Sequence, residues 1–329
     1  MKKYRTLLIS LGNMGRNHYK TLAHSDQFDL TAVLEPNREH KNWQLVAEKI
    51  KRYYSLEEIS SSDFDLALVA SPTETHYMVG KDLLERGLSI LMEKPLAATA
   101  NQASELVRTA NVKNLELVVG QVERCNNVIV LARKILDSRV LGEIVSVNSK
   151  RGGAYPAMVK RGNNVILDLA IHDLDLMRET FGEIELLGAQ GKCVRDSEIV
   201  DCAGIQLKTS SGVSLGVNAN WFSPHRLREW EIIGSESFLM IDFLTQSCRL
   251  TGKDLTAKLE ELDLPPSTNN SNDYFDDYSF AADTKPPLER QLDEWHKHLA
   301  GQSSIMATGA EALEMIRICE QADKIIRNS

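Results

Sequence analysis

Short apolar runs alternate with amphipathic stretches along the N-terminal part of the chain. Each apolar run has the length of a buried parallel strand, and the stretch of residues 75–87 has helical periodicity and ends at a glycine. Strands that alternate with helices predict a doubly wound parallel sheet. The predicted strands are residues 6–10, 30–34, 64–70, 88–92 and 115–120, and residues 44–51 are predicted to form part of a helix.

The pattern changes after Gly120. Residues 127–138 have helical periodicity, whereas residues 143–151 alternate like a strand with one exposed face. Successive strands with short turns predict a mostly antiparallel open sheet in an α+β domain. Its outer face must be covered by polar residues or by another subunit. The other predicted strands are residues 184–194, 203–208, 213–222, 228–233 and 237–243.

The C-terminal part begins with a polar stretch, residues 260–287, which predicts a long excursion. Amphipathic helices are predicted at 288–299 and 310–326, and Thr308 with Glu311 fits a capping box. A chain of 329 residues is too long for a single compact core. We therefore expect two domains, residues 1–121 and residues 122–329.

Composition excludes several classes of protein. The chain has 38 Lys and Arg against 46 Asp and Glu, a formal net charge of −8, and no basic cluster, which argues against nucleic-acid binding. It has no apolar run long enough to cross a membrane, and its N-terminal run is too short for a signal peptide. The five cysteines form no C-x-x-C pair, which favours a reduced, cytoplasmic compartment. No pattern suggests a metal site.

A glycine-containing turn follows the first predicted strand. Gly12 and Gly15 hold the second and third positions of a G-x-G-x-x-G loop, but Ser10 holds the first. A helix is predicted to begin near Met14, and N–H groups at a helix start can bind a pyrophosphate. The sequence therefore predicts that a dinucleotide contacts residues Gly12, Asn13, Met14 and Gly15.

Glu35 ends the second predicted strand, about 20 residues after Gly15. Dinucleotide-binding folds place an acid there to accept hydrogen bonds from the adenosine ribose. A carboxylate would repel a 2′-phosphate, so NAD is favoured over NADP. Arg38 leaves the choice between NAD and NADP open, because a nearby cation can accommodate the 2′-phosphate of NADP or cover the adenine. The alternative for Glu35 is a solvated charge at a strand end.

Polar residues also follow the other predicted strands. Ligands of such sheets bind at the carboxyl ends of the strands, so one crevice is expected to collect these side chains. His76, just beyond, is interpreted either as a cofactor contact or as a capping or packing residue. The further candidates for cofactor binding are Ser71, Thr73, Glu93, Lys94 and Gln121.

The segments SLGNMGRNH, SPTETH, EKP, GQVERCNN and DLAIHD occur in this order. Together they resemble the Gfo/Idh/MocA oxidoreductase family, the relatives of glucose–fructose oxidoreductase and inositol dehydrogenase. The resemblance implies an α/β Rossmann domain, an α+β C-terminal domain and a homo-oligomer, dimer or tetramer, formed through the C-terminal sheet. It also implies that Lys94 lies beside the nicotinamide and contacts the reacting hydroxyl, and that the Lys94–Pro95 bond is cis. Glu93 would position the nicotinamide ribose or carboxamide.

Residues 165–181 read as a helix that places Asp168, His172, Asp175 and Glu179 on one face. This face is either an acidic, solvated surface or part of an active site. The family places an acid and a histidine with the spacing of Asp168 and His172. We therefore predict Lys94, Asp168 and His172 as catalytic residues, with the imidazole as the base. Asp173 points to another face and is expected to be structural.

Candidate substrate contacts precede and follow this helix. Arg151, Tyr155, Arg161 and Asn163 lie in or next to a glycine-containing loop, where arginines suit a phosphate or carboxylate or form ordinary salt bridges. Trp221, Phe222, His225 and Arg226 lie at the end of a predicted strand and are candidates to stack on a ring. Arg124 and Asn126 match the family segment E-R-F-N-P, although Cys125 and Asn127 depart from it, so their role stays open between substrate and domain contact. The predicted substrate contacts are Lys94, Arg124, Arg151, Tyr155, Asn163, Asp168, His172 and Trp221.

The segments NANWFSPHRLREWEIIGSE, ERCNN and DLAIHDLDLM most resemble the UDP-N-acetylglucosamine 3-dehydrogenases of this family. That resemblance implies hydride transfer from C3 of a UDP-linked amino sugar to NAD+. Two alternatives remain. One is an inositol or free-sugar dehydrogenase, and the other is a non-catalytic regulator that senses NAD or sugar. The joint presence of Lys94, Asp168 and His172 speaks against the regulator.

Overall fold

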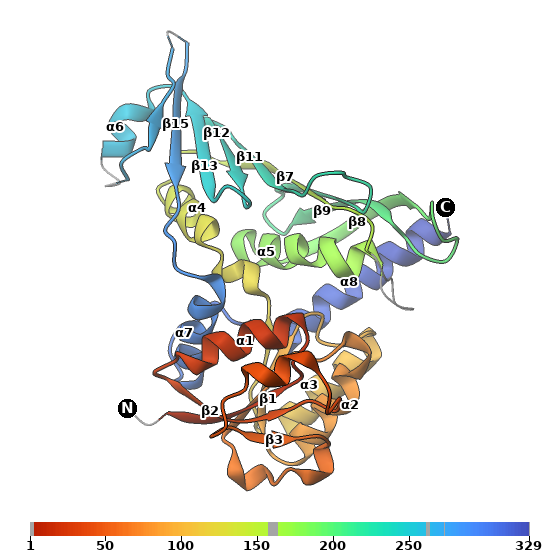
Figure 1. Ribbon diagram of the computed structural model, residues 1–329. Coiled ribbons are helices and arrows are strands. Elements are labelled where there is room, and N and C mark those ends of the chain that lie inside the picture. Colours follow the sequence, from red (N-terminus) through yellow and green to blue (C-terminus); the bar gives the residue numbers. More distant parts are fainter. Residues whose placement is uncertain (1–2, 157–163, 261–263, 273, 329) are drawn as a thin grey trace. The chain divides into compact units, whose positions relative to one another are not determined.

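The computed structural model describes residues 3–156, 164–260, 264–272 and 274–328 (Figure 1). The chain divides into two compact units. The first unit comprises Met1–Val122 and Pro287–Arg317, and the second comprises Glu123–Pro286 and Ile318–Ser329. The sequence analysis assigns everything after residue 121 to the second domain, and the division differs from this because Trp295 stacks on Phe28 in the core of the first unit.

The sheet of the first unit has the strand order β16-β6-β5-β4-β1-β2-β3. Its strands pair in parallel except β16, which runs antiparallel to β6 at the edge. This is the predicted doubly wound α/β arrangement, and the reversal of order beside β1 is the place where such sheets bind ligands. The strands are β1 (Tyr4–Ile9), β2 (Phe28–Leu34), β3 (Lys51–Tyr53), β4 (Leu66–Val69), β5 (Ser89–Glu93), β6 (Leu117–Gly120) and β16 (Ala307–Thr308).

Helices cover this sheet in pairs. Helix α1 (Asn13–Ala23) packs against α7 (Pro287–Leu299), and α2 (Thr73–Glu85) packs against α3 (Ala100–Val112). Helix α8 (Gly309–Arg327) begins with the predicted capping box, in which the backbone N–H of Glu311 donates to Oγ1 of Thr308 and that of Thr308 donates to Glu311. The prediction of a helix at 44–51 is wrong. This stretch contains the end of the short 3₁₀ helix η1 (Lys41–Leu45), and the first residue of β3 follows after turns.

The turn between β1 and α1 depends on a close backbone approach. A Cβ atom at Gly15 would lie 2.1 Å from the carbonyl oxygen of Ser10, so only glycine fits there. Ser10 has φ +77°, a conformation that favours glycine, and the family loop has glycine at this position. Serine therefore holds a strained conformation at the start of the predicted pyrophosphate loop.

The sheet of the second unit has the order β14-β15-β13-β12-β11-β7-β10-β9-β8. All its strand pairs are antiparallel except β7 with β10. The predicted mostly antiparallel sheet is thereby confirmed. The strands are β7 (Ile144–Gly152), β8 (Ile184–Lys192), β9 (Cys202–Thr209), β10 (Ser214–Asn220), β11 (Leu227–Gly234), β12 (Ser237–Asp242), β13 (Ser247–Gly252), β14 (Thr268–Asn269) and β15 (Asp276–Ala281).

In its described residues, the polar stretch at 260–287 contains a strand that the sequence analysis does not predict. It contributes β15, which pairs with β13 along six residues, and the sequence analysis missed both strands. Polar side chains suit β15 because Asp277 accepts hydrogen bonds from Arg249 of β13 across the pair. Helix α6 (Leu255–Glu260) precedes this stretch.

Helices α4 (Asn127–Asp137) and α5 (Ile171–Phe181) lie on one side of this sheet (Figure 1). The four residues Val122–Cys125 form the 3₁₀ turn η4 before α4, and a π-helical turn, η5 (Ile166–Ala170), precedes α5. The predicted helix at 165–181 therefore begins with wider turns than an α-helix has. In the described part of the chain, no helix has the length and apolar character needed to cross a membrane.

Candidate active site

A cavity of about 620 Å³ lies at the carboxyl ends of β1, β2 and β4 in the first unit. Its volume is in the range of cofactor and substrate sites. Three of the predicted cofactor residues, Gly12, Glu35 and Ser71, line it. The predicted contacts Asn13, Met14 and Gly15 form the first turn of α1 directly after Gly12, and Thr73 begins α2. The remaining wall is formed by Ile9, Ser10, Leu34, Pro36, Asn37, His40, Tyr54, Ser55, Leu56, Glu57, Pro72, Thr75 and Val79.

Glu35 is buried in the wall of this cavity, with 7% of its surface exposed, so it is not the solvated charge of the alternative interpretation. Its Oε2 accepts hydrogen bonds from the backbone N–H of Leu11 at 2.9 Å and from the hydroxyl of Ser10 at 3.3 Å. Its Oε1 accepts one from the N–H of Asn37 at 3.1 Å. A carboxylate can accept about four hydrogen bonds, so capacity for a ligand hydroxyl remains on Oε1.

Arg38 stacks on one lining residue. Its guanidinium carbon lies 4.0 Å from the ring centre of Tyr54, and this contact holds the cation beside the cavity without making it part of the wall. Both predicted roles for Arg38, covering the adenine or accommodating a 2′-phosphate, are compatible with this place.

Glu93 and His18 form a buried pair that joins β5 to α1. Oε1 of Glu93 is hydrogen-bonded to Nε2 of His18 at 2.5 Å, and Oε2 accepts the backbone N–H of Lys94 at 3.2 Å. The peptide bond between Lys94 and Pro95 is cis, as the family resemblance implies. Glu93 thus contacts both α1 and the segment that carries the predicted catalytic lysine.

His76 is 1% exposed, and both of its ring nitrogens lie near main-chain oxygens. Nδ1 lies 2.8 Å from the carbonyl oxygen of Pro95, and Nε2 lies 2.8 Å from that of Ser71. Burial lowers the pKa of His76, although the two carbonyls and the carboxylates of Glu93 and Glu74 act in the opposite direction. The ring joins the segments that follow β4 and β5, as in the packing alternative considered from the sequence.

Gln121, at the end of β6, has a buried side-chain amide, and Gln121 as a whole is 3% exposed. Neither its oxygen nor its nitrogen has a hydrogen-bond partner among the described residues. Leaving a buried amide unpaired costs about 1–3 kcal/mol, so a ligand with complementary polar groups fits this position. A carboxamide or a ribose hydroxyl has such groups. The residues at the strand ends therefore fit a nicotinamide dinucleotide.

In the second unit, Asn164 starts the helix that carries the predicted catalytic pair. Its side-chain oxygen accepts the backbone N–H groups of Ile166 and Leu167 at 3.0 and 2.9 Å. The π-helical turn follows, a feature frequent at functional sites. Within it, Oδ2 of Asp168 accepts a hydrogen bond from Nε1 of Trp221 at 3.2 Å. His172 lies four residues further on, in the first turn of α5, and is 9% exposed.

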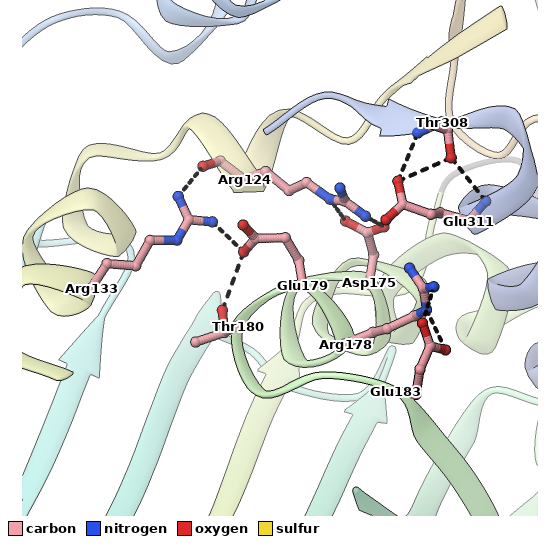
Figure 2. A network of polar contacts seen from close by, with 9 residues as sticks. All are labelled: Arg124, Arg133, Asp175, Arg178, Glu179, Thr180, Glu183, Thr308 and Glu311. Carbon is pink, nitrogen blue, oxygen red and sulfur yellow. Dashed lines mark hydrogen bonds and ion pairs between the residues drawn. The ribbon is translucent and has the colours of Figure 1, made fainter. Parts of the chain in front are cut away.

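The other acids of the predicted face are engaged in ion pairs (Figure 2). Asp175 binds Nε and Nη2 of Arg124, each at 2.7 Å, and both side chains are buried. Glu179 pairs with Arg133, whose other nitrogen donates to the carbonyl of Arg124. These contacts replace the solvated acidic face of the alternative interpretation, and they give Arg124 a structural contact. Asn126 caps α4 through the N–H of Val128.

Arg151, a predicted substrate contact, is buried and paired within the second unit. Arg151 is 1% exposed, and its guanidinium forms a two-point pair with Asp173 at 2.8 and 3.0 Å. It also contacts Oε1 of Glu123 at 3.0 Å. Burial alone would lower the pKa of Arg151, but the two carboxylates outweigh it and raise the pKa. Of the two alternatives for Arg151, the structure shows the salt bridge, with Asp173 and Glu123 as its partners.

Trp221 also differs from its predicted role. It is 2% exposed and offers almost no surface for stacking on a substrate ring. Instead its ring packs edge-on against Tyr155, with centres 5.4 Å apart, while its N–H holds Asp168. The predicted contacts Arg161 and Asn163 lie outside the described residues.

One cation near this cluster was missed from the sequence. The guanidinium of Arg195 lies 4.5 Å from the ring centre of Tyr155 and 5.8 Å from that of Phe222. Residue 195 belongs to the connection between β8 and β9, and no spacing or motif in the sequence relates it to Tyr155. Within the residues that the structure describes, no three His, Cys, Asp or Glu side chains gather as a metal site.

Two family models match the chain. The model of an oxidoreductase family with an NAD-binding Rossmann fold matches residues 4–121. The model of the GFO/IDH/MocA C-terminal domain matches residues 129–239. Together the two matches cover more than half of the chain.

Curated relatives agree with these matches. The rhizopine catabolism protein MocA of Rhizobium meliloti is 27% identical over 187 residues, which are 56% of this chain and 59% of that protein. The UDP-N-acetylglucosamine 3-dehydrogenase of Acidithiobacillus ferrooxidans is 25% identical over 252 residues, which are 75% of this chain and 76% of that protein. The match thus spans less than two thirds of the length of MocA.

Solved structures extend the likeness over the whole chain. The UDP-N-acetylglucosamine 3-dehydrogenase GnnA from Acidithiobacillus ferrooxidans has a TM-score of 0.81 at 19% identity, with 100% of this chain and 99% of that chain covered. The WlbA dehydrogenase from Bordetella pertussis, in complex with NADH and UDP-GlcNAcA, has a TM-score of 0.77 at 19% identity, with 98% and 97% covered. At this identity the likeness shows the fold. The chain therefore belongs to the GFO/IDH/MocA family of oxidoreductases, with an NAD-binding Rossmann domain followed by the family's C-terminal domain.

Proposed function

We propose that this protein is an NAD-dependent dehydrogenase that oxidises a secondary hydroxyl of a sugar. The observation that carries the proposal is the anchored carboxylate of Asp168, which the indole N–H of Trp221 holds on a π-helical turn four residues before His172. An oriented carboxylate near a histidine base stabilises the imidazolium that forms when the base takes a proton. The cavity with Glu35 in its wall supports the cofactor half of the proposal.

Three side chains take part in the proposed reaction, and each has its own role. The imidazole of His172 takes the proton of the sugar hydroxyl, and Asp168 stabilises the resulting imidazolium. The ammonium of Lys94 donates a hydrogen bond to the reacting oxygen and stabilises its developing negative charge. NAD+, when bound, supplies a hydride acceptor. The proposal requires Lys94 and His172 to converge on one hydroxyl.

Two parts of the first unit would hold the cofactor. Gly12 to Gly15 at the start of α1 would bind the pyrophosphate, since helix N-termini favour anions. Glu35 would accept the adenosine ribose, and its charge disfavours a 2′-phosphate, so we propose NAD rather than NADP. Gln121 and Glu93 would position the nicotinamide end.

For the substrate, we propose a UDP-linked amino sugar that is oxidised at C3. The proposal rests on what three similar proteins are called. One curated relative is a UDP-N-acetylglucosamine 3-dehydrogenase, and one similar solved structure is GnnA, an enzyme of the same name. A second solved structure is a dehydrogenase in complex with a UDP-sugar. An inositol or free-sugar dehydrogenase is the second candidate. A non-catalytic sensor of NAD or sugar is the third.

One assay separates the three candidates. The purified protein is incubated with NAD+ or NADP+ and a panel of UDP-N-acetylglucosamine, its uronic acid, myo-inositol and free N-acetylglucosamine, and NAD(P)H absorbance is followed. Reduction with a UDP-sugar alone supports the proposal. Reduction with inositol or a free sugar supports the second candidate. Cofactor binding without reduction by any sugar supports the sensor.

We also propose a homo-oligomer, dimer or tetramer, that forms through the sheet of the second unit. Exposed apolar side chains on three of its strands support this: Leu187 on β8, Val145 on β7 and Ile233 on β11. Light scattering after size-exclusion chromatography tests the oligomeric state.

All five cysteines are free thiols, which supports a cytoplasmic location.

A further inference from the structure

The connection between β8 and β9 presents an arginine on a fixed turn. The carboxylate of Asp201, a residue with no exposed surface, accepts the backbone N–H groups of Val194 and Arg195, at distances between 2.9 and 3.1 Å. The carbonyl of Asp201 accepts the N–H of Trp221 at 3.0 Å. The backbone at Arg195 is thereby tied to the strand end that carries Trp221.

The side chain of Arg195 is exposed, and it is stacked rather than paired. Its guanidinium lies over the rings of Tyr155 and Phe222, within the distance of a cation–π contact. Across the described residues, no carboxylate forms an ion pair with Arg195. Arg124 and Arg151 differ in this respect, because each forms a two-point pair with a buried aspartate. Stacking fixes the plane of the guanidinium and leaves its edge N–H groups available to an anion.

Successive contacts connect this cation to the proposed catalytic carboxylate inside the second unit. Arg195 stacks on Tyr155, Tyr155 packs against Trp221, and Trp221 donates to Asp168. A nucleotide sugar has a similar layout, with a diphosphate next to the sugar that reacts. The chain has a net charge of −8, so a dianionic group needs a local cation such as this one.

We infer that Arg195 binds the diphosphate of the nucleotide-sugar substrate, with Tyr155 and Phe222 as the platform that orients its guanidinium. This inference rests on the proposed function and deepens it. The planar N–H fork suits two phosphate oxygens at once, which an ammonium cannot match. Arg195 thereby selects UDP-linked sugars over free sugars.

The test measures binding of UDP to the full-length protein by titration calorimetry, with uridine and NAD+ as further probes. Arg195→Gln weakens UDP binding about 10- to 100-fold, the effect of losing charge-assisted hydrogen bonds. Arg195→Lys weakens it less. Uridine and NAD+ binding stay unchanged, because neither uses this cation. Arg108→Gln, at an exposed arginine of α3, is the matched control and leaves all three affinities unchanged.

The side chain of Arg195 makes no contact that the fold of the turn needs, since Asp201 binds only backbone groups there. Loss of folding therefore does not explain a weaker affinity. UDP binding that changes by less than about twofold in Arg195→Gln overturns the inference. Wild-type protein that binds UDP no better than uridine also overturns it.

The two proposals fail in different ways. If the wild type oxidises a UDP-sugar and Arg195→Gln has the same KM for it, the proposed function stands and the inference fails. If UDP binding depends on Arg195 but no sugar reduces NAD+, the inference stands and the proposed dehydrogenase activity fails.

Discussion

The two units of this protein treat their polar side chains differently. In the first unit, polar groups at the strand ends face a cavity, and the buried amide of Gln121 has no partner among the described residues. In the second unit, two arginines that the sequence offers as ligand contacts pair with buried aspartates instead: Arg124 with Asp175, and Arg151 with Asp173. Charged residues in a regular spacing can thus form a ligand site or stabilise the fold beneath it. A charged side chain that is buried with an oppositely charged partner belongs to the second kind.

The largest expected effect tests the part of the second unit that we assign to chemistry. His172→Ala should lower turnover of the sugar identified in the panel by about 10²- to 10⁴-fold, because the base is lost. Affinity for NAD+ should stay unchanged, because the residues that we propose to bind the cofactor belong to the first unit. Steady-state kinetics and NAD+ titration measure both, with exposed His24→Ala as the control. Normal turnover in His172→Ala would remove this residue from the mechanism.

The next effect tests whether the buried pair of Arg151 and Asp173 stabilises the second unit. Arg151→Met should lower the free energy of unfolding by about 3–5 kcal/mol, because Asp173 is left as a buried charge without its partner. Urea unfolding measures this, and Arg226→Met, at an exposed position, should change it little. A variant that kept full stability but lost substrate affinity would restore Arg151 as a ligand contact.

In the first unit, Glu35→Ala should weaken NAD+ binding about 10- to 100-fold, because the N–H groups of Leu11 and Asn37 lose their acceptor and the loop loses its anchor. NADP+ binding should weaken less, because a repulsive charge is removed as well. Fluorescence titration with both cofactors measures the ratio. Glu39→Ala, at an exposed glutamate on the same connection, is the control, and equal losses for both cofactors would contradict the selective role.

Acid should lower the stability of the second unit by protonating the buried carboxylate of Glu123. Burial alone raises the pKa of this carboxyl, but the charge of Arg151 and the hydrogen bonds of Asn126 and Arg151 outweigh it and lower the pKa below its ordinary value of 4.5. A lowered pKa in the folded state means stability that is complete above pH 4.5 and is lost as the pH falls through the folded-state pKa. The free energy of unfolding of Glu123→Gln should therefore fall less steeply below pH 4.5.

The exposed substitution Glu143→Gln is the matched control and should keep the wild-type slope. An identical slope in Glu123→Gln would show that other carboxyls account for the acid sensitivity.

The smallest effect concerns the strained serine of the first unit. Ser10→Gly relieves a positive φ but loses the hydroxyl contacts with Glu35 and Gly12, whereas Ser10→Ala loses the contacts and keeps the strain. Ser10→Gly should be more stable than Ser10→Ala by about 0.5–1 kcal/mol, after the larger chain entropy of glycine is counted. Thermal unfolding of the two variants measures the difference, and equal stability would mean that Ser10 is not strained.

The sequence by itself determined the alternating strands and helices of most of the first unit, and it placed the candidate cofactor residues at the strand ends. Apolar runs of strand length, the loop with Gly12 and Gly15, and Glu35 at a strand end are local signals, and in a parallel sheet the strand ends gather at one edge whatever lies further along the chain. The same holds for the capping box of Thr308 and Glu311, whose partners are three residues apart.

Only the tertiary structure decided which charged residues of the second unit are free to bind a ligand. The partners of Arg151 come from η4 and α5, and the platform of Arg195 comes from segments about 30 to 40 residues away on either side, so no local pattern reveals them. The strands β13 and β15 were missed for a related reason. Their stability comes from cross-strand pairs such as Arg249 with Asp277, and these form only when the sheet register brings distant residues together.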